Sequence, residues 1–249
     1  MEQYEPHIRC SKDANVKYAI VPGDPKRVDR VKEFLEEPKE IANNREFKSV
    51  VGYYKGVKVI VTSTGIGGPS TGIAVEELKN IGVDTIIRIG SCGALQDNIK
   101  LGDLIIGTAA VRDEGTSKTY VETEYPAVAD FKVVQSLIES AKEQKFVYHH
   151  GVIRSHDSFY TDEEENIDNY WKTKNVLGAD MESAALFVIG RLRNIKTASI
   201  LNVVVESDGN LESGINEYVD GDNDSMDGEK KEILTALEGI VKLNSGKTL

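Results

Sequence analysis

Cysteine and histidine are scarce in this sequence. Its 249 residues include two cysteines, Cys10 and Cys92, which stand far apart and in no metal-binding spacing. The four histidines form no array of the kind that holds a catalytic metal. Neither a disulfide framework nor a cysteine-based metal site is expected, and a reducing cytoplasmic setting fits this cysteine usage.

Basic charge and long apolar runs are also lacking. The 30 Lys and Arg residues are outnumbered by 41 Asp and Glu residues, which gives a formal net charge of −11. A protein that binds nucleic acid or an anionic membrane needs the opposite balance. No apolar run approaches the roughly 20 residues of a membrane span, and the first residues do not have the character of a signal peptide. We expect a soluble cytoplasmic protein.

No internal repeat, low-complexity linker or break in composition divides the chain, so residues 1–249 are predicted to form a single domain. Apolar, β-branched stretches alternate with segments of helical periodicity, and residues 47–64 have the pattern of a hairpin. This alternation predicts an α/β fold with a mixed, twisted central β-sheet flanked by helices. Residues 112–130 are expected to form a polar loop. Residues 206–229, which contain no Lys or Arg, are expected to form a solvated loop or lid.

An arginine interrupts a buried strand that is predicted over residues 84–93. β-Branched residues surround Arg88 there, and Gly90, Ser91 and Gly93 follow it. A buried guanidinium requires an anion or a carboxylate to neutralise it, while the glycines allow backbone N–H groups to approach a ligand. Two interpretations stand side by side: a seat for an oxyanion at a strand end, or a buried pair between the arginine and a carboxylate.

A second potential anion site lies near the N-terminus. A strand over residues 17–22 is followed by Gly23, Asp24 and Pro25, which suit a helix start, and Arg27 lies in the first turn. Free helix N–H groups beside an arginine favour an anion. An ordinary capped helix has the same pattern.

Further candidate residues stand where strands or helices begin and end. The glycine-rich loop of residues 64–72 has neither the ending of a P-loop nor the third glycine of a dinucleotide fingerprint. Phe159 follows a strand, and Glu182 precedes an apolar helix, where a buried carboxylate needs donors. Because open α/β sheets bind ligands at the carboxyl ends of their strands, these residues together predict one ligand site.

Seven motifs, taken in order, strongly resemble those of the purine nucleoside and uridine phosphorylases. They are Gly23-Asp24-Pro25 with Arg27, Arg45-Glu46-Phe47, Thr64 to Ser70, Arg88 to Gly93, Tyr125 to Asp130, Phe159-Tyr160 and Met181-Glu182-Ser183. The resemblance covers the chain from about His7 to Asp208 and implies the nucleoside phosphorylase fold. Such enzymes split a nucleoside with inorganic phosphate into free base and ribose 1-phosphate.

The resemblance implies a role for each matching residue. Phosphate would be held by Gly23, Arg27, Arg88 and Ser91, with Arg45 supplied by a neighbouring subunit. Ribose would contact Met181, Glu182 and a neighbouring subunit's His7, and the base would lie against Cys92, Gly93 and Phe159. Three guanidiniums suit the charge and geometry of phosphate, and Arg88 would also act in catalysis by stabilising the transition state.

A few positions bear on the identity of the base. Glu163 and Glu165 stand where the uridine branch places Gln and Arg to read the pyrimidine edge. Ser207-Asp208 matches the purine branch, in which the aspartic acid binds the base and protonates its ring as the bond breaks. We therefore expect a purine nucleoside phosphorylase of purine salvage, with uridine phosphorylase as the alternative. Arg45-Glu46-Phe47 and the glycine-rich loop look more like the uridine branch.

The resemblance also implies an assembly and an ion. A dimer that shares its active sites is expected, with three dimers in a homohexamer, and potassium can lie between subunits near Glu46, Ile66 and Ser70. No cofactor is expected to be required beyond inorganic phosphate as co-substrate. Two other functions stay open: a nucleosidase, which uses water, and a non-catalytic nucleoside-binding protein.

Overall fold

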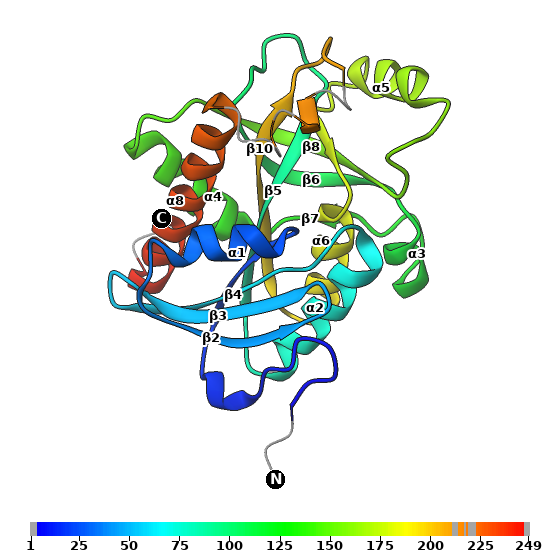
Figure 1. Ribbon diagram of the computed structural model, residues 1–249. Helices are drawn as coiled ribbons and strands as arrows, with labels where there is room; N and C mark the ends of the chain where they lie inside the picture. The colour runs from blue at the N-terminus through cyan, green and yellow to red at the C-terminus, as the bar shows by residue number, and fades with distance from the viewer. Residues whose placement is uncertain (1–3, 211–213, 217, 219–222, 247–249) are drawn as a thin grey trace.

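The structure is a computed structural model that describes residues 4–210, 214–216, 218 and 223–246 (Figure 1). The strands of this part of the chain form one sheet. They are β1 (Tyr18–Pro22), β2 (Glu36–Asn44), β3 (Phe47–Tyr54), β4 (Val57–Thr62), β5 (Thr85–Ala94), β6 (Leu104–Asp113), β7 (Ala127–Val128), β8 (Tyr148–His156), β9 (Gly178–Asp180) and β10 (Lys196–Val205). The helices are the 3-10 helix η1 (Lys12–Ala14), α1 (Pro25–Lys32), α2 (Gly68–Asn80), α3 (Thr116–Tyr120), α4 (Phe131–Glu143), α5 (Glu164–Lys172), α6 (Ser183–Leu192) and α8 (Asn223–Ser245).

The sheet combines parallel pairs around β1 and β5 with antiparallel pairs elsewhere, including β10 with β6 and β5 with β9. β1 lies between β4 and β5, and β5 also pairs with β10, all in parallel. β2, β3 and β4 form an antiparallel meander. β10 pairs with β6 as well, and β6 leads through β8 and β9 back to β5, so this part of the sheet closes on itself. The mixed sheet that the sequence predicts is confirmed.

Parallel pairing brings the ends of three strands to one edge of the sheet. Val21 and Ser199 lie beside Arg88 in the neighbouring strands. The segments that leave β1, β5 and β10 therefore meet, although they are far apart in the sequence.

Helices lie on either side of the sheet (Figure 1). α2 packs on α6, while α4 packs on α8 at the other side. Residues 183–190 of α6 are all buried, as expected for a helix that is apolar on every side. Within the described ranges, no helix is both long enough and apolar enough to cross a membrane.

The structure differs from the sequence-based expectation in two segments. Residues 112–130, predicted as a loop, contain α3 and β7. The acidic segment 206–229, also predicted as a loop, contains the first turns of α8, while residues 211–213, 217 and 219–222 lie outside the described residues. β2 was not predicted because its residues are mainly polar and show no alternation, and its pairing with β3 defines it.

Candidate active site

A cavity of about 720 Å³ opens where the ends of β1, β5 and β10 meet. This volume is in the range of small-molecule sites. Most of the residues that the sequence singles out line this cavity: Gly23, Arg27, Arg88, Ser91, Cys92, Gly93, Phe159, Met181 and Glu182. The fold thus gathers these nine residues from four separate stretches of chain around one space.

Arg88, on β5, lines the cavity and pairs with two carboxylates of the protein. Its Nε atom donates to Asp180 Oδ2 at 2.9 Å, and its Nη2 atom forms an ion pair with Glu182. Its Nη1 atom is buried and has no hydrogen-bond partner among the described residues. Burial opposes the charge on the guanidinium, but the carboxylates of Glu182 and Asp180 outweigh it and raise the pKa of Arg88. Arg88 therefore stays charged, with one donor left for a ligand.

The absence of a side chain at Gly90 leaves space for this guanidinium. A Cβ atom at Gly90 would lie 2.6 Å from Nη2 of Arg88 and 3.1 Å from Cδ2 of Leu201. No side chain fits there unless the arginine moves. The glycine that the sequence suggests for ligand approach is thus also required for the position of Arg88.

Glu182 lies just before α6 and is 5% exposed. Its Oε1 atom accepts a hydrogen bond from the N–H of Gly67 at 2.5 Å, and Oε2 pairs with Arg88. Burial raises the pKa of Glu182, against the charge of Arg88. The glycine-rich loop before α2 thus fixes a carboxylate at the cavity wall, where it can accept hydrogen bonds from ligand hydroxyls.

Asp180 is a buried member of this group that the sequence did not single out. It accepts hydrogen bonds from Ser155 Oγ at 2.6 Å and from Ser183 Oγ at 2.7 Å, in addition to Arg88. Its proximity to Glu182 in the sequence was the available signal. The three-residue strand β9 that positions it was too short to predict.

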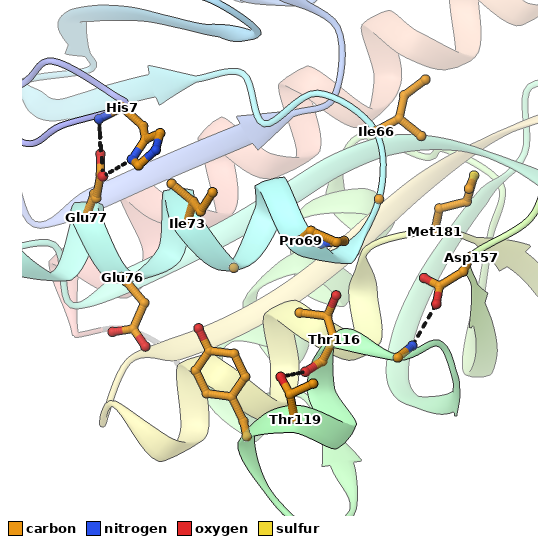
Figure 2. Close-up of a pocket in the computed structure, with 14 residues that line it drawn as sticks. His7, Ile66, Pro69, Ile73, Glu76, Glu77, Thr116, Thr119, Asp157 and Met181 are labelled. Carbon is orange, nitrogen blue, oxygen red and sulfur yellow. Dashed lines mark hydrogen bonds and ion pairs between the residues drawn. The ribbon is translucent and has the colours of Figure 1, made fainter.

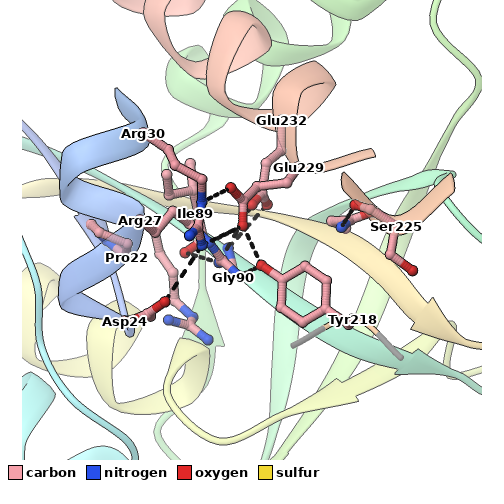
Figure 3. Close-up of polar contacts among 12 residues, drawn as sticks. Pro22, Asp24, Arg27, Arg30, Ile89, Gly90, Tyr218, Ser225, Glu229 and Glu232 are labelled. Atoms are coloured by element: carbon pink, nitrogen blue, oxygen red, sulfur yellow. Dashed lines mark hydrogen bonds and ion pairs between the residues drawn. The ribbon is translucent and has the colours of Figure 1, made fainter. Parts of the chain in front are cut away.

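Arg27, in the first turn of α1, is held by residues of the C-terminal part of the chain (Figure 3). Nε donates to Glu229 Oε2 at 2.9 Å, Nη2 donates to the hydroxyl of Tyr218, and Nη1 lies 3.4 Å from Glu232 Oε1. Glu229 also pairs with Arg30. Sequence reasoning missed both glutamates. Their spacing of three residues, which places them on one face of a helix, was the only hint.

Acidic side chains gather where Phe159 lines the cavity. Glu164 and Asp168 of α5 line it too, and His156 lies beside them. Nη1 of the buried Arg154 is 3.6 Å from Glu164 Oε1 and 3.5 Å from Asp168 Oδ1. Oε2 of Glu164 is buried without a hydrogen-bond partner in the part of the chain that is described. Burial, followed by the charge of Glu164, raises the pKa of Asp168.

The acidic positions that the sequence analysis singled out in this region are exposed, and residues next to them line the cavity. Glu163 and Glu165, which stand at the positions of the pyrimidine-reading residues, are exposed, whereas Glu164 between them lines the cavity. Asp208, the expected proton donor, is exposed and does not line the cavity, although Ser207 and Gly209 do.

The two residues expected to come from a neighbouring subunit lie away from this cavity. His7 lines a separate hollow between α2 and α3, where its Nδ1 atom lies 2.6 Å from Glu77 Oε1 (Figure 2). Ile66 and Met181 border both spaces. Arg45 is exposed at the turn between β2 and β3.

The residues suggested for potassium lie around one loop. Glu46 packs against Gly65, and the Ser70 hydroxyl donates to the carbonyl oxygen of Ile66 at 3.2 Å. Carboxylate, carbonyl and hydroxyl oxygens are the donors that a hard cation such as potassium prefers. These oxygen atoms are therefore of the kind that binds potassium, and a potassium site at this loop is a proposal.

Comparison with known proteins decides the family. Residues 17–237 match the family model of the phosphorylase superfamily. The chain belongs to this family. Within the phosphorylase superfamily it is 38% identical to the guanosine phosphorylase of Halorubrum lacusprofundi, over 94% of this chain and 95% of that protein. It is 44% identical to the uridine phosphorylase of Thermococcus kodakarensis, over 79% of this chain and 76% of that one.

A crystal structure from the superfamily has the same fold. The uridine phosphorylase of Vibrio fischeri, complexed with 6-hydroxy-1-naphthoic acid, superposes with a TM-score of 0.90 at 46% identity, covering 96% of this chain and 97% of that one. The resemblance drawn from the sequence motifs is confirmed at the level of family and fold. The names of these relatives do not support a purine preference, because uridine phosphorylases prevail among them.

Proposed function

We propose that this protein cleaves a ribonucleoside with inorganic phosphate, releasing the free base and ribose 1-phosphate. The observation that carries this proposal is Arg88, which lines the same cavity as Gly90 to Gly93 and whose buried Nη1 atom has no hydrogen-bond partner among the described residues. A charged donor of this kind is suited to an oxyanion, and membership of the phosphorylase superfamily supports the reaction class.

The proposed mechanism assigns the arginine end of the cavity to phosphate. As the bond between C1′ and the base nitrogen breaks, its electron pair goes to the base and positive charge develops on the sugar. A phosphate oxygen forms the new bond to C1′, and the proton that the hydrogenphosphate ion gives up passes overall to the base, which leaves ribose 1-phosphate as the dianion. Arg27, Arg88 and Ser91 would position the phosphate, whose negative charge stabilises the transition state. Glu182 would accept hydrogen bonds from the ribose hydroxyls.

Uridine is the first candidate for the nucleoside, because most of the similar proteins are named uridine phosphorylases. The expectation of a purine rested on protonation by Asp208. That side chain is exposed and outside the cavity wall, so we do not include it in the mechanism.

Guanosine is the second candidate, and the acidic wall beside Phe159 favours it. Ionised carboxylates accept hydrogen bonds and cannot donate them. Guanine presents adjacent N–H donors on one edge, whereas uracil presents a single N–H between two carbonyl oxygens. The unpartnered Oε2 atom of Glu164 suits the guanine edge, and one relative is named a guanosine phosphorylase.

Assays with a panel of nucleosides test both the requirement for phosphate and the choice of base. We expect uridine and guanosine to be cleaved only when phosphate is present, and release of base at an equal rate without phosphate would indicate a nucleosidase. If Glu164 reads guanine, Glu164→Gln should lower kcat/KM for guanosine by about tenfold or more and leave uridine within about threefold. Glu165→Gln, at an exposed neighbouring position, is the matched control.

The same panel tests the rejected proton donor. We expect Asp208→Asn to change kcat/KM for guanosine by less than about threefold. A loss of ~10²–10⁴-fold, the usual effect of removing a general acid, would restore the purine mechanism.

The proposal includes an assembly in which neighbouring subunits complete each site. Arg45 and His7 lie away from the cavity of their own chain, and Ile66, which borders both spaces, is 78% exposed. A partner chain that covers this region would bring its own Arg45 and His7 to the cavity. Potassium between subunits and a trimer of such dimers are part of the same proposal.

A further inference from the structure

The C-terminal helix α8 places two buried carboxylates behind the arginine end of the cavity (Figure 3). Glu229 and Glu232 have side chains that are 2% and 0% exposed. Oε2 of Glu232 accepts a hydrogen bond from the N–H of Gly90 at 3.1 Å, and Oε1 lies 3.4 Å from Nη1 of Arg27. Neither glutamate lines the cavity, so any effect on a bound anion must pass through Arg27 or Gly90.

The charges in this region do not favour a divalent anion when every group is ionised. Three guanidiniums meet five carboxylates, which leaves a formal charge of −2: Arg27, Arg30 and Arg88 with Asp24, Asp180, Glu182, Glu229 and Glu232. Six of these eight side chains are at most 6% exposed, so water screens them poorly. Addition of a phosphate dianion therefore favours the neutral form of one of the carboxyl groups.

Glu232 is the carboxyl group best suited to hold that proton. Asp180, Glu182 and Glu229 each accept at least one short hydrogen bond or ion pair from an arginine. Glu232 accepts one hydrogen bond from a backbone N–H, and its Oε1 atom has no hydrogen-bond partner within the described ranges. Of the four buried carboxylates, its ionised form is the least stabilised.

The effect of burial on the pKa of Glu232 supports the choice of this carboxyl group. Burial raises the pKa of Glu232 to about 8, with the charge of Arg27 opposing it and that of Glu229 adding to it. The other groups that face it are Arg88 and, more remotely, Tyr218 and Cys92. The pKa of Cys92 is held well above its usual value, and that of Tyr218 is also raised, in both cases chiefly by burial. Neither group therefore titrates where Glu232 does.

We propose that Glu232 takes up a proton when a divalent oxyanion binds at Arg27 and Arg88, and that it thereby keeps the site receptive to phosphate. Glu232 is a positioning residue, which acts through Arg27 and the N–H of Gly90. That the anion is phosphate rests on the proposed function. By linkage, an anion that favours the protonated carboxyl must bind more weakly once the carboxyl has lost its proton. Phosphate affinity should therefore fall as the pH rises above about 8, the pKa of Glu232 in the free protein.

Calorimetric titration of the intact protein with inorganic phosphate tests this proposal. Titrations at pH 8.5 in two buffers of different ionisation enthalpy give the number of protons taken up. For the parent we expect at least about half a proton per bound phosphate, and a Kd that rises about tenfold or more between pH 8 and 9.5, where free phosphate is already mainly the dianion. For Glu232→Gln we expect almost no proton uptake and a Kd that changes less than about twofold over the same range.

The glutamine variant retains an oxygen that can accept from Gly90. The matched control is Glu238→Gln on the same helix, whose carboxylate pairs with Tyr54 and Lys55. The Glu238→Gln variant should take up as many protons as the parent and show the same dependence of Kd on pH.

The outcomes separate this inference from the proposed function. Phosphate binding without proton uptake by the parent at pH 8.5 would overturn the role of Glu232 and leave the proposed function standing. Equal uptake by the parent and a folded Glu232→Gln variant would do the same. If phosphate does not bind at any pH, the proposed function fails and this inference fails with it. The parent measurement alone decides the matter if the variant does not fold.

Discussion

At the scale of single residues, Arg88 combines two tasks that usually exclude each other. Two of its nitrogens pair with Asp180 and Glu182, and the third is buried with no hydrogen-bond partner among the described residues. The two interpretations of this arginine from the sequence, ion pair and anion seat, therefore apply to different atoms of the same guanidinium. A planar group with several donors in fixed directions makes this division possible.

The Arg88→Lys variant tests whether catalysis needs the several separate donors of the guanidinium. Lysine keeps the charge but offers one ammonium group, which cannot meet two carboxylates and an oxyanion in the same directions. We expect kcat/KM for phosphate to fall by about 10²-fold or more, because the lost contact strengthens in the transition state.

The control for this variant is Arg193→Lys. Arg193 pairs with Glu76 at 2.9 Å and does not line the cavity. It should stay within about threefold of the parent. An Arg88→Lys variant that is equally active would remove Arg88 from the proposed mechanism.

At the scale of elements, helix α6 and strand β10 set the position of Glu182. Glu182 immediately precedes α6, and α6 packs closely on β10 near the far end of the helix. A Cβ atom at Gly190 would lie 2.3 Å from Cγ2 of Thr197. The glycine lets the helix approach the strand at this point.

Gly190→Ala should therefore destabilise the fold. Alanine favours a helix over glycine by about 1 kcal/mol, but overpacking a buried contact costs about 1–3 kcal/mol. At 2.3 Å the clash is severe, so we expect the overpacking to dominate and the free energy of unfolding to fall. Urea denaturation measures the change.

A second substitution separates the clash from other effects. Thr197→Ser removes Cγ2, so the double variant should recover much of the stability that Gly190→Ala loses. If Gly190→Ala alone unfolds at the same or a higher urea concentration than the parent, the helix does not need the glycine.

At the scale of the whole molecule, the cavity of one chain does not include all the residues that the proposed reaction uses. Arg45 is exposed at a turn, and His7 lies in the hollow between α2 and α3. Their distance from the cavity is the physical reason to expect a second chain at this face.

Mixing two inactive variants tests this expectation. A chain with His7→Ala and Arg45→Ala still has its own Arg88, while an Arg88→Ala chain still provides His7 and Arg45. If sites are shared, hybrid dimers contain one complete site, and phosphorolysis should return to a sizeable fraction of the parent rate. Verified hybrids that stay as inactive as the separate variants would show that each chain works alone.

The sequence predicted most of the cavity wall but little of what lies behind it. Gly23, Arg88 and Ser91 could be singled out because glycines and an arginine at strand ends are local signals. Glu229 and Glu232 gave no such signal, because acidic residues on a helix are usually solvated. Their role depends on where α8 crosses α1 and β5. Asp208 is the opposite case, because its motif predicted a place in the site but its side chain is exposed.

The sequence by itself determined the alternation of strands and helices, the mixed sheet, and the residues that resemble the phosphorylases. These follow from periodicity, turn residues and local motifs, which act over a few neighbouring positions. Only the tertiary structure decided that Glu164 rather than Glu163 or Glu165 lines the cavity, and that α8 brings Glu229 and Glu232 to Arg27. The rotation of a helix about its axis and the distance between remote charges depend on packing across the whole chain. Their effect also depends on burial, because two charges interact strongly only where water is excluded.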